Sequence, residues 1–380
     1  MSAGTLIVGG GLAAQRCAET LRRCGEEGAI RMVCAEPHLP YDRPPLSKAV
    51  LADPEADATL AFRDAGWYAD HHVELVRGVA ATGLDPVARA VSLGDGRRVG
   101  YERLLVATGS RPRRLAALER FANVSTLRTL DDAERLRDVL TAGGRLVVVG
   151  AGFIGQEVAA AAAKAGMRVT IIEAAAAPLD ALLGSAIGAW FTRLHEARGV
   201  VVLANARIVA AQGTDRVEAL ALADGRSVGC DHVVVGVGVE PDVAWMGGEH
   251  AGGVRADVHG TTALPGVFAA GDAAATYEPA LGRHVAGGHW ESAARQGAAV
   301  ARNMLGLAPR AAAPASFWTD LYDTRVQYLG HAALADATTL DGDPAERDFA
   351  VTFTRSGRPV AVLLVGRPAA LPAARATLAA

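Results

Sequence analysis

Several features that mark common classes of protein are scarce in this 380-residue chain. It has only four cysteines, Cys17, Cys24, Cys34 and Cys230, and no two form a Cys-x-x-Cys or other close pair. A zinc site, an iron–sulfur site and a redox-active cysteine pair are therefore not indicated. We expect all four thiols to be packed in the interior. Histidines in paired metal-ligand spacing are also missing, so we assign no metal role to His71, His72, His195, His250 or His259.

Lysine and long apolar runs are scarce as well. Only Lys48 and Lys164 stand beside 36 arginines, that is, 38 basic residues minus two. The net charge of −3 implies no general affinity for nucleic acid. No apolar stretch is long enough to span a bilayer, and the first apolar run begins too early for a signal peptide. We expect a cytoplasmic protein with neither nucleic acid nor a membrane as its partner.

Glycine, by contrast, is concentrated in two similar loops. Gly9-Gly10-Gly11-Leu12-Ala13-Ala14 follows the apolar run Leu6-Ile7-Val8, and Gly150-Ala151-Gly152-Phe153-Ile154-Gly155 follows residues 146–149. In such a loop the first glycine makes a tight turn and the second lets the backbone approach a pyrophosphate. The third small residue lets the next helix pack closely, and that helix directs its N-terminal N–H groups at the phosphates. Glycine-rich turns without a ligand also occur between strand and helix.

Each loop has an acidic residue in the place where a ribose would lie. Glu36 ends the apolar segment 30–35, and Glu173 ends the segment 169–172. Both stand about 20 residues or slightly more past their loop, where a carboxylate can accept hydrogen bonds from ribose hydroxyls. Two loops with two acids predict two dinucleotides bound at once. The simplest function for such a protein is to pass electrons from one dinucleotide to the other.

The order of segments predicts an α/β protein in which one Rossmann-like dinucleotide-binding domain is inserted in another. Residues 1–112 and 243–308 would form the outer domain, residues 113–242 the inserted one, and residues 309–380 a small α+β domain. We expect helices near 131–141, 185–198 and 290–304, and an alanine/proline linker at 308–315. Buried strands that end in small-residue or glycine turns are expected at 104–109, 233–238 and 267–272. Four prolines within residues 37–45 predict irregular structure until a helix starts near Pro45.

At this point the chain resembles a known family, the FAD- and NADH-dependent ferredoxin reductases of bacterial oxygenase systems, which includes the putidaredoxin and rubredoxin reductases. The most specific match is Pro40-Tyr41-Asp42-Arg43-Pro44-Pro45-Leu46-Ser47-Lys48. Further matches are 107–109, 150–157, 236–238, 270–272, 289–290, 317–320 and 326–330. The resemblance implies a glutathione-reductase-like arrangement, with FAD on the first loop and NADH on the second.

The resemblance also implies which residues contact the cofactors. Lys48 would stabilise charge on the reduced flavin and pair with Glu157, and these two are the predicted catalytic residues. Contacts with FAD or NADH are implied for Gly9, Gly11, Leu12, Ala13, Ala14, Glu36, Arg43, Lys48, Ala107, Thr108, Gly109, Arg111, Gly271, Asp272, His289, Trp290, Trp318, Gly150, Gly152, Phe153, Ile154, Gly155, Glu173, Gly236, Val237 and Gly238. The chain departs from the family at Gly288, where a glutamate is common, and at residues 174–177, which lack an arginine.

Each single residue has a simpler interpretation that stays open at this point. Lys48 could be an exposed helical residue and Glu157 a solvated helical carboxylate. Asp272 could be the N-cap of a helix beginning at Ala273, which is compatible with flavin binding. Trp290 and Trp318 could be core residues.

The predicted reaction is hydride transfer from NADH to FAD, followed by transfer of single electrons to a small [2Fe–2S] ferredoxin that serves an oxygenase or a cytochrome P450. Other acceptors on the same fold are rubredoxin, monodehydroascorbate and oxygen. A non-enzymatic protein that binds FAD and NADH to sense redox state is the alternative from another class. The oligomeric state stays open between monomer and homodimer. The most basic stretch, a candidate docking surface for an acidic ferredoxin, contains Arg283, Arg295, Arg302 and Arg310.

Overall fold

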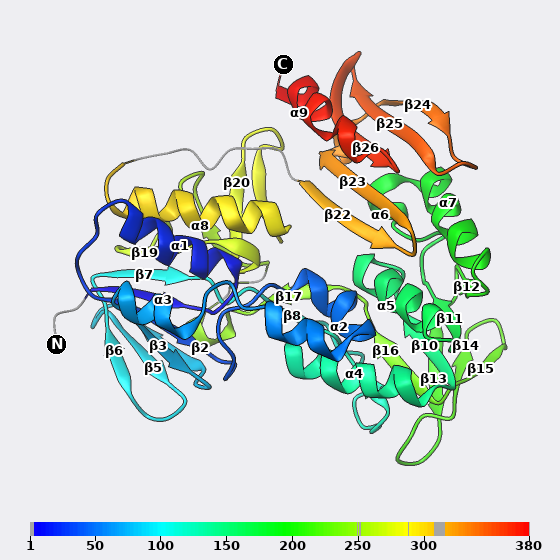
Figure 1. Cartoon of the computed structure of the whole chain (residues 1–380), viewed down its shortest axis with the longest axis horizontal. Helices are drawn as coiled ribbons and strands as arrows, with labels where there is room; N and C mark the ends of the chain where they lie inside the picture. The colour runs from blue at the N-terminus through cyan, green and yellow to red at the C-terminus, as the bar shows by residue number, and fades with distance from the viewer. Residues whose placement is uncertain (1–3, 249, 251, 288, 308–315, 380) are drawn as a thin grey trace. The chain divides into compact units, whose positions relative to one another are not determined.

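The computed structural model describes residues 4–248, 250, 252–287, 289–307 and 316–379. The chain divides into two compact units (Figure 1). The first consists of Met1–Arg43, Ala58–Arg111 and Glu240–Ala315, and the second of Pro44–Asp57, Pro112–Val239 and Ser316–Ala380. The chain passes from one unit to the other within the short strands β8 (Ser110–Pro112) and β17 (Val239–Pro241), and again before and after residues 44–57.

The first unit is built on a five-stranded parallel sheet in the order β19-β7-β1-β2-β3. Its strands are short and apolar, and β1 is buried along its whole length, as expected for a sheet covered on both faces. The central position of β1 places the first glycine loop at the carboxyl end of the sheet, where ligands bind in such folds. The strands are β1 (Thr5–Val8), β2 (Ile30–Cys34), β3 (Val73–Arg77), β7 (Arg103–Val106) and β19 (Val267–Ala269).

Two helices of the first unit, α1 (Leu12–Arg23) and α8 (Trp290–Met304), lie side by side against this sheet (Figure 1). Their close approach depends on Gly297, because a Cβ on that residue would lie 2.1 Å from the carbonyl oxygen of Ala13. Buried side chains of α1, α8 and the sheet, including Ile7 and Val300, form one hydrophobic cluster.

Smaller elements complete the first unit. Two three-stranded sheets follow the orders β4-β5-β6 and β18-β20-β21. The elements are α3 (Ala65–Asp70), β4 (Ala81–Asp85), β5 (Ala90–Leu93), β6 (Arg98–Gly100), η3 (Ala244–Met246), β18 (Val254–Ala256), η4 (Gly271–Ala273), β20 (Ala274–Glu278) and β21 (Arg283–Ala286).

The second unit repeats the plan with a parallel sheet in the order β12-β11-β10-β16-β9. The central β10 carries the second glycine loop at its carboxyl end, and α5 follows that loop. The elements are β9 (Val124–Ser125), α4 (Leu130–Ala142), β10 (Arg145–Val149), α5 (Phe153–Lys164), β11 (Arg168–Ile172), α6 (Asp180–Leu183), α7 (Ser185–Glu196), β12 (Val201–Leu203), β13 (Ile208–Gln212), β14 (Ala219–Leu222), β15 (Ser227–Gly229) and β16 (His232–Val235).

The same unit contains an antiparallel C-terminal sheet in the order β22-β23-β26-β25-β24, drawn in orange and red in Figure 1. Trp190 and Phe191 of α7 pack in one cluster with Phe349 and Leu363 of this sheet, and the indole N–H of Trp190 donates to the carbonyl of Pro344. The elements are β22 (Ser316–Leu321), β23 (Thr324–Gly330), η5 (Ala332–Leu334), β24 (Ala337–Asp343), β25 (Asp348–Arg355), β26 (Arg358–Val365), η6 (Pro368–Ala370) and α9 (Leu371–Ala379). The irregular segment predicted around the prolines gives way to η1 (Pro44–Ser47), α2 (Ala49–Ala52) and η2 (Pro54–Thr59).

Most segments that the sequence predicted are present. The helix predicted at 290–304 is α8, and those near 131–141 and 185–198 are α4 and α7. The linker predicted at 308–315 lies outside the described residues. The sequence did not indicate that the C-terminal sheet shares its core with α7, and the three-domain division stays a prediction. Within the described residues, no helix is both long and apolar enough to cross a membrane.

Candidate functional site

The loop after β1 has the geometry of a phosphate cradle. Gly9 has φ +133°, and a Cβ on it would lie 2.1 Å from the carbonyl oxygen of Ala107, so only glycine fits there. A Cβ on Gly11 would meet no atom within 4 Å, which leaves open space beside the start of α1. Gly11 caps α1 without a side-chain hydrogen bond. The N–H groups and the dipole of the first turn, at Leu12, Ala13 and Ala14, therefore suit a pyrophosphate.

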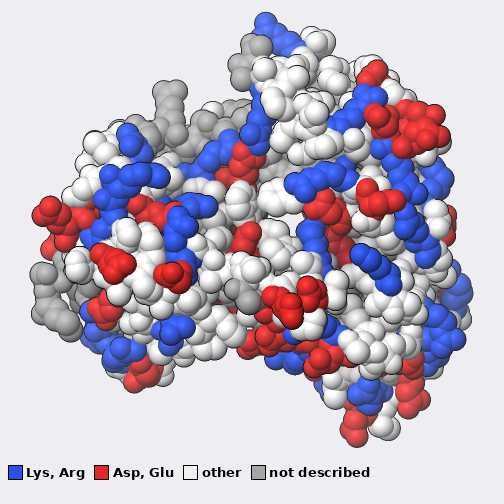
Figure 2. All heavy atoms as spheres, viewed as in Figure 1, with Lys and Arg blue, Asp and Glu red and all other residues white. Residues whose placement is uncertain are grey.

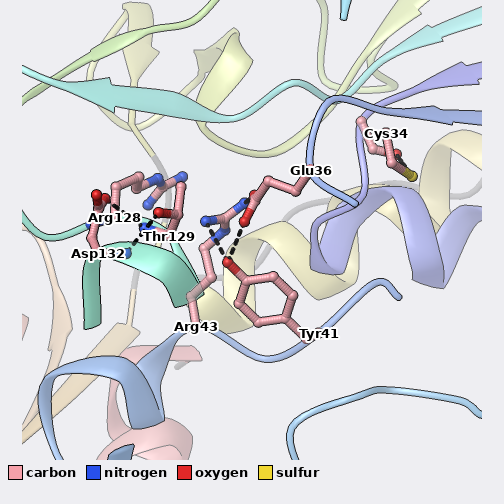
Figure 3. A network of polar contacts seen from close by, with 8 residues as sticks. Cys34, Glu36, Tyr41, Arg43, Arg128, Thr129 and Asp132 are labelled. Carbon is pink, nitrogen blue, oxygen red and sulfur yellow. Dashed lines mark hydrogen bonds and ion pairs between the residues drawn. The ribbon is translucent and has the colours of Figure 1, made fainter. Parts of the chain in front are cut away.

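The acidic residue beyond this loop is held by the proline-rich segment. Glu36 accepts hydrogen bonds from Tyr41 Oη at 2.6 Å and from Arg43 Nη2 at 2.7 Å. Figure 3 shows the Tyr41 and Arg43 side chains directed at the Glu36 carboxylate. Burial alone would lower the pKa of Arg43, but Tyr41, Glu36 and Asp272 together raise it. The Arg43 guanidinium is thus a fixed cation between Glu36 and Asp272, which are both predicted FAD contacts.

Asp272 lies in the single turn η4 rather than at the start of a helix. Ala270 caps that turn, and β20 begins at Ala274, so the N-cap interpretation of Asp272 is wrong. The run of small residues after Asp272 enters a strand because it pairs with β18. The carboxylate instead accepts a hydrogen bond from Ser110 Oγ at 2.7 Å.

The segments after β7 and before α8 meet the same region. Thr108 Oγ1 donates to the carbonyl of Asp242 at 2.6 Å, and Arg111 pairs with Glu240 at 2.8 Å. Trp290 begins α8 and donates from Nε1 to Asp42 Oδ1 at 2.6 Å.

His289 caps α8 beside these residues. Burial lowers the pKa of the His289 imidazole, and the nearby Asp272 opposes that shift. Both Trp290 and His289 are half-buried, so neither is a plain core residue. Gly288, where the family carries a glutamate, lies outside the described residues. The structure thus brings the predicted residues of five separate segments of the first unit together.

The second loop has the same geometry in the second unit. Gly150 has φ +98°, and a Cβ on it would lie 2.5 Å from the carbonyl oxygen of Gly236. A Cβ on Gly155 would lie 2.2 Å from the carbonyl oxygen of Gly150, so α5 approaches the loop closely. Gly152 caps α5 without a side-chain hydrogen bond. The segment Gly236-Val237-Gly238 therefore lies against this loop and completes a second phosphate cradle.

Glu173 is fixed by backbone groups around that loop. Its Oε2 accepts from the N–H of Ala151 at 2.6 Å, and its Oε1 accepts from the N–H of Ala175 at 2.8 Å. Ile154, on the first turn of α5, is 44% exposed, whereas Phe153 packs on Phe317 with ring centroids 4.3 Å apart. Each carboxylate oxygen keeps a further lone pair that a ribose hydroxyl can use.

Lys48 and Glu157 form an ion pair within the second unit. Lys48 Nζ lies 2.7 Å from Oε1 of Glu157, whose side chain is only 4% exposed. Thr319 Oγ1 donates to Oε1 at 2.7 Å, and Ser47 Oγ donates to Oε2. Lys48 Nζ also donates to the carbonyl of Pro44. The buried Glu157 carboxylate is thus held by Ser47 of η1, by Lys48 and by Thr319 of β22.

This arrangement overturns the simpler interpretations of the two residues. Glu157 is not a solvated helical carboxylate, because the Lys48 ammonium and two hydroxyls enclose it. Lys48 is not a fully exposed lysine either, since its side chain is 23% exposed and bent onto Glu157. The part that the pair takes at a flavin stays a prediction.

Trp318 lies on β22 next to Thr319, so the two side chains are on opposite faces of the sheet. The guanidinium of Arg325 lies 5.5 Å from the ring centroid of Trp318. Gln327 stands across the strand pair, and its buried Oε1 has no hydrogen-bond partner among the described residues. Trp318 is half-buried, and its contact with the flavin stays a prediction.

The four cysteines are all free thiols. Burial raises the pKa of Cys17 and of Cys34 to about 12 and that of Cys230 to about 11. The expectation of interior packing is wrong for Cys24, which is half-buried because it caps the end of α1 at the surface. In the described part of the chain, no three His, Cys, Asp or Glu side chains are grouped as metal ligands would be.

Sequence reasoning missed several residues around the second loop. Ser47 and Thr319 contact Glu157, and the alternation of side chains along the predicted strand 317–320 could have separated Thr319 from Trp318. His195 and Gln156 are fully buried and hydrogen-bonded to each other. No local pattern marks His195, because its partners are distant in the sequence.

Comparison with known proteins agrees with this geometry. The anthranilate 1,2-dioxygenase system ferredoxin–NAD(+) reductase component of Burkholderia cepacia is 39% identical over 384 residues, covering 99% of this chain and 94% of that protein. Putidaredoxin reductase of Pseudomonas putida is 35% identical, and the match covers 96% of this chain and 88% of that protein. The crystal structure of the covalent putidaredoxin reductase–putidaredoxin complex superposes with a TM-score of 0.95 at 33% identity, covering 99% of this chain and 93% of that one.

Two family descriptions together span nearly all of the chain. Residues 316–380 match the reductase C-terminal family, and residues 4–297 match the pyridine nucleotide-disulphide oxidoreductases. The fold class and the family predicted from the sequence are both confirmed. This chain belongs to the pyridine nucleotide-disulphide oxidoreductase family, among those members that carry a reductase C-terminal domain.

Proposed function

We propose that this protein is an FAD-dependent NADH:ferredoxin oxidoreductase. It takes a hydride from NADH and passes single electrons to a small [2Fe–2S] ferredoxin, which serves an oxygenase or a cytochrome P450. The observation that carries this proposal is the pair of phosphate cradles, one in each unit, in a chain similar to ferredoxin reductases over 99% of its length. When bound, FAD supplies the redox chemistry, while the protein supplies orientation and charge.

The first unit fits FAD. The open space at Gly11 and the uncapped first turn of α1 suit its pyrophosphate. Glu36, held by Tyr41 and Arg43, would accept hydrogen bonds from the adenosine ribose. Asp272, held by Ser110, would accept a hydrogen bond from the ribityl chain.

The second unit fits NADH. The loop from Gly150 to Gly155 would hold the pyrophosphate, and Glu173 would orient the adenosine ribose. A 2′-phosphate there would meet this carboxylate, and the alanine run 174–177 offers no arginine to compensate. The protein should therefore prefer NADH to NADPH.

Lys48 and Glu157 would act on the electrostatics of the flavin reaction. The ammonium is a fixed positive charge that stabilises negative charge developing nearby, and Glu157 holds it in one position. Thr319 and Ser47 hold Glu157 in turn. Hydride transfer itself requires no acid–base residue.

The electron acceptor is not a disulfide. A disulfide reductase needs a reactive cysteine pair, whereas the thiols here are single, free and, in three cases, held protonated by burial. Free thiols and the use of NADH both suit the cytoplasm, which we propose as the location.

An acidic ferredoxin would dock against exposed arginines. Arg283 on β21 and Arg302 near the end of α8 are exposed, whereas Arg295 pairs with Glu291 at 2.8 Å. Arg310 lies outside the described residues. Figure 2 shows basic and acidic side chains interspersed over the viewed face, so docking on that face would depend on single arginines rather than on one broad basic area.

The flavin content of the purified protein tests this proposal first. We expect a yellow protein with one FAD per chain, whose visible absorbance is bleached by anaerobic NADH. A colourless protein that cannot be reconstituted with FAD would refute it. Bleaching followed by turnover with oxygen or rubredoxin, but never with a ferredoxin, would support another acceptor. Bleaching without turnover on any acceptor would support a redox-sensing binding protein.

A further inference from the structure

His195 is a buried polar residue that the proposed reaction does not use. It lies near the end of α7, is 0% exposed and touches two other polar side chains. Its Nδ1 lies 2.8 Å from Tyr322 Oη, and its Nε2 lies 3.3 Å from Gln156 Oε1. Burial lowers the pKa of the imidazole to about 4, so the ring is neutral at physiological pH. A buried neutral histidine with two partners must donate to one of them and accept from the other.

The partners determine the direction of these hydrogen bonds. Gln156 Nε2 donates to the carbonyl oxygen of Ala151 at 3.0 Å, so Gln156 Oε1 is the atom that faces His195. Because Oε1 can only accept, His195 carries its proton on Nε2. Its Nδ1 then accepts from the hydroxyl of Tyr322. The chain of donors runs from Tyr322 through His195 and Gln156 to Ala151, and we call it the Tyr322 relay.

The relay ends in the second glycine loop. The carbonyl of Ala151 receives the last hydrogen bond, and the N–H of the same residue donates to Glu173 Oε2 at 2.6 Å. Ala151 is 0% exposed, so no water competes for these groups. The two peptide groups that flank the Cα of Ala151 are therefore held, one by the relay and the other by the Glu173 carboxylate.

The other end of the relay is anchored in the C-terminal sheet. Tyr322 occupies the turn between β22 and β23 with φ +59°. The guanidinium of Arg198 lies 5.0 Å from its ring centroid and pairs with Asp323 at 3.0 Å. Burial raises the pKa of Tyr322 to about 12, so its hydroxyl keeps the proton that it donates.

We propose that Tyr322, His195 and Gln156 are positioning residues for the pyridine nucleotide. They hold the loop from Gly150 to Gly155, and with it Glu173, in the conformation that binds NADH. This inference rests on the proposed assignment of NADH to the second loop. It gives the C-terminal domain a part in coenzyme binding although Tyr322 touches the loop only through two other side chains.

Three variants of the FAD-loaded protein test the relay: Tyr322→Phe, Gln156→Leu and the double variant. Because each relay hydrogen bond contributes a modest net free energy, we expect Tyr322→Phe to raise the Kd for NAD⁺ about three- to tenfold. The KM for NADH with ferricyanide should rise in parallel, while kcat at saturating NADH stays within about twofold. Since both residues act through one chain, the double variant should be no worse than Gln156→Leu alone. Isothermal titration calorimetry measures the Kd for NAD⁺, and steady-state kinetics measure KM and kcat.

Tyr328→Phe is the matched control. It removes the hydroxyl of the buried Tyr328 in β23, whose Oη accepts a hydrogen bond from the N–H of Ala332 at 2.6 Å, outside the relay. It should lower Tm as Tyr322→Phe does and leave the NAD⁺ Kd unchanged. An unchanged Kd in Tyr322→Phe, an equal rise in Tyr328→Phe, or additive effects in the double variant would overturn the relay. A wild-type protein that binds no NAD⁺ and oxidises no NADH would instead overturn the proposed function.

Discussion

At the scale of single residues, the Lys48–Glu157 pair is the feature whose disruption has the clearest cost in folding free energy. Exposed ion pairs contribute about 0–1 kcal/mol, whereas removing one partner of a buried pair costs about 3–5 kcal/mol. Replacing both by apolar groups is often neutral or stabilising. Stability therefore does not explain why a chain with two lysines keeps one of them on a buried glutamate. A charge held at one place for the proposed flavin reaction would explain it.

Replacing Lys48 by methionine should slow flavin reduction while FAD stays bound. Loss of one fixed charge that stabilises developing charge predicts a roughly ten- to hundredfold slower rate. Anaerobic stopped-flow mixing with NADH measures it. Lys164→Met removes the other, exposed lysine and should be neutral. Lys48→Met/Glu157→Gln removes the uncompensated carboxylate, so normal folding with slow reduction in this variant separates chemistry from stability. Reduction at the wild-type rate in Lys48→Met would show that the ammonium has no part in the reaction.

If NADH binds at the second loop as proposed, coenzyme choice would depend on Glu173, because its carboxylate would accept hydrogen bonds from both ribose hydroxyls and repel a 2′-phosphate. We expect at least a tenfold preference for NADH in kcat/KM, about 1.4 kcal/mol. Glu173→Ala should narrow that ratio, mainly by raising the KM for NADH. Steady-state kinetics with ferricyanide and both coenzymes give the numbers. Equal kcat/KM for NADH and NADPH in the wild-type protein would contradict this assignment.

At the scale of elements, α8 contacts α1 at Ala13, in the first turn after the first glycine loop. Gly297 lets the two helices approach until its Cα faces the backbone of Ala13. The sequence predicted a helix at roughly 290–304, where α8 lies, but nothing local in the sequence indicated that a glycine in its middle faces α1. The signal lies in a contact between residues far apart along the chain, which one sequence does not reveal.

Gly297→Ala should therefore weaken both the fold and flavin binding. The new methyl would lie 2.1 Å from a backbone oxygen that cannot move freely. Overpacking of this kind costs about 1–3 kcal/mol. Scanning calorimetry and the FAD content of the purified protein measure the two effects. Gly66→Ala in α3, where the nearest atom is at 3.4 Å, is the control and should be neutral or stabilising. A Gly297→Ala protein with unchanged Tm and FAD content would refute the proposed close packing.

Two histidines, the buried His195 and the half-buried His232, should make the second unit sensitive to acid. Burial lowers the pKa of His195 and of His232 from 6.5 to about 4. Between those values the unfolded chain binds more protons than the folded one, so stability is full above pH 6.5 and falls as pH decreases toward 4. At pH 5 each histidine should lower the free energy of unfolding by roughly 2 kcal/mol relative to neutral pH. Calorimetry at pH 7 and pH 5 tests this. The His195→Gln variant should show a smaller decrease in Tm from pH 7 to pH 5 than the wild-type protein. An identical decrease in both proteins would contradict the lowered pKa of His195.

At the scale of the whole molecule, the sequence predicted the architecture better than the connections between its parts. Two glycine loops with downstream acids gave two dinucleotide folds, because each signal is local to one strand, turn and helix. The ion pair at Glu157 followed only from resemblance, since Lys48 and Glu157 are 109 positions apart. The Tyr322 relay and the core shared by α7 and the C-terminal sheet had no signal at all. Periodicity marks which face of an element is buried but not which partner covers it.

The central claim is that electrons pass from NADH through FAD to a ferredoxin. It is tested most directly by NADH-driven reduction of cytochrome c, with and without the cognate [2Fe–2S] ferredoxin. We predict a strong increase on adding the ferredoxin. The increase should weaken with salt, because steering between exposed charges is screened over roughly 10 Å at 0.1 M. Reduction of ferricyanide should be far less sensitive to salt. A yellow, NADH-reducible protein whose cytochrome c rate stays the same with the ferredoxin present would contradict the account.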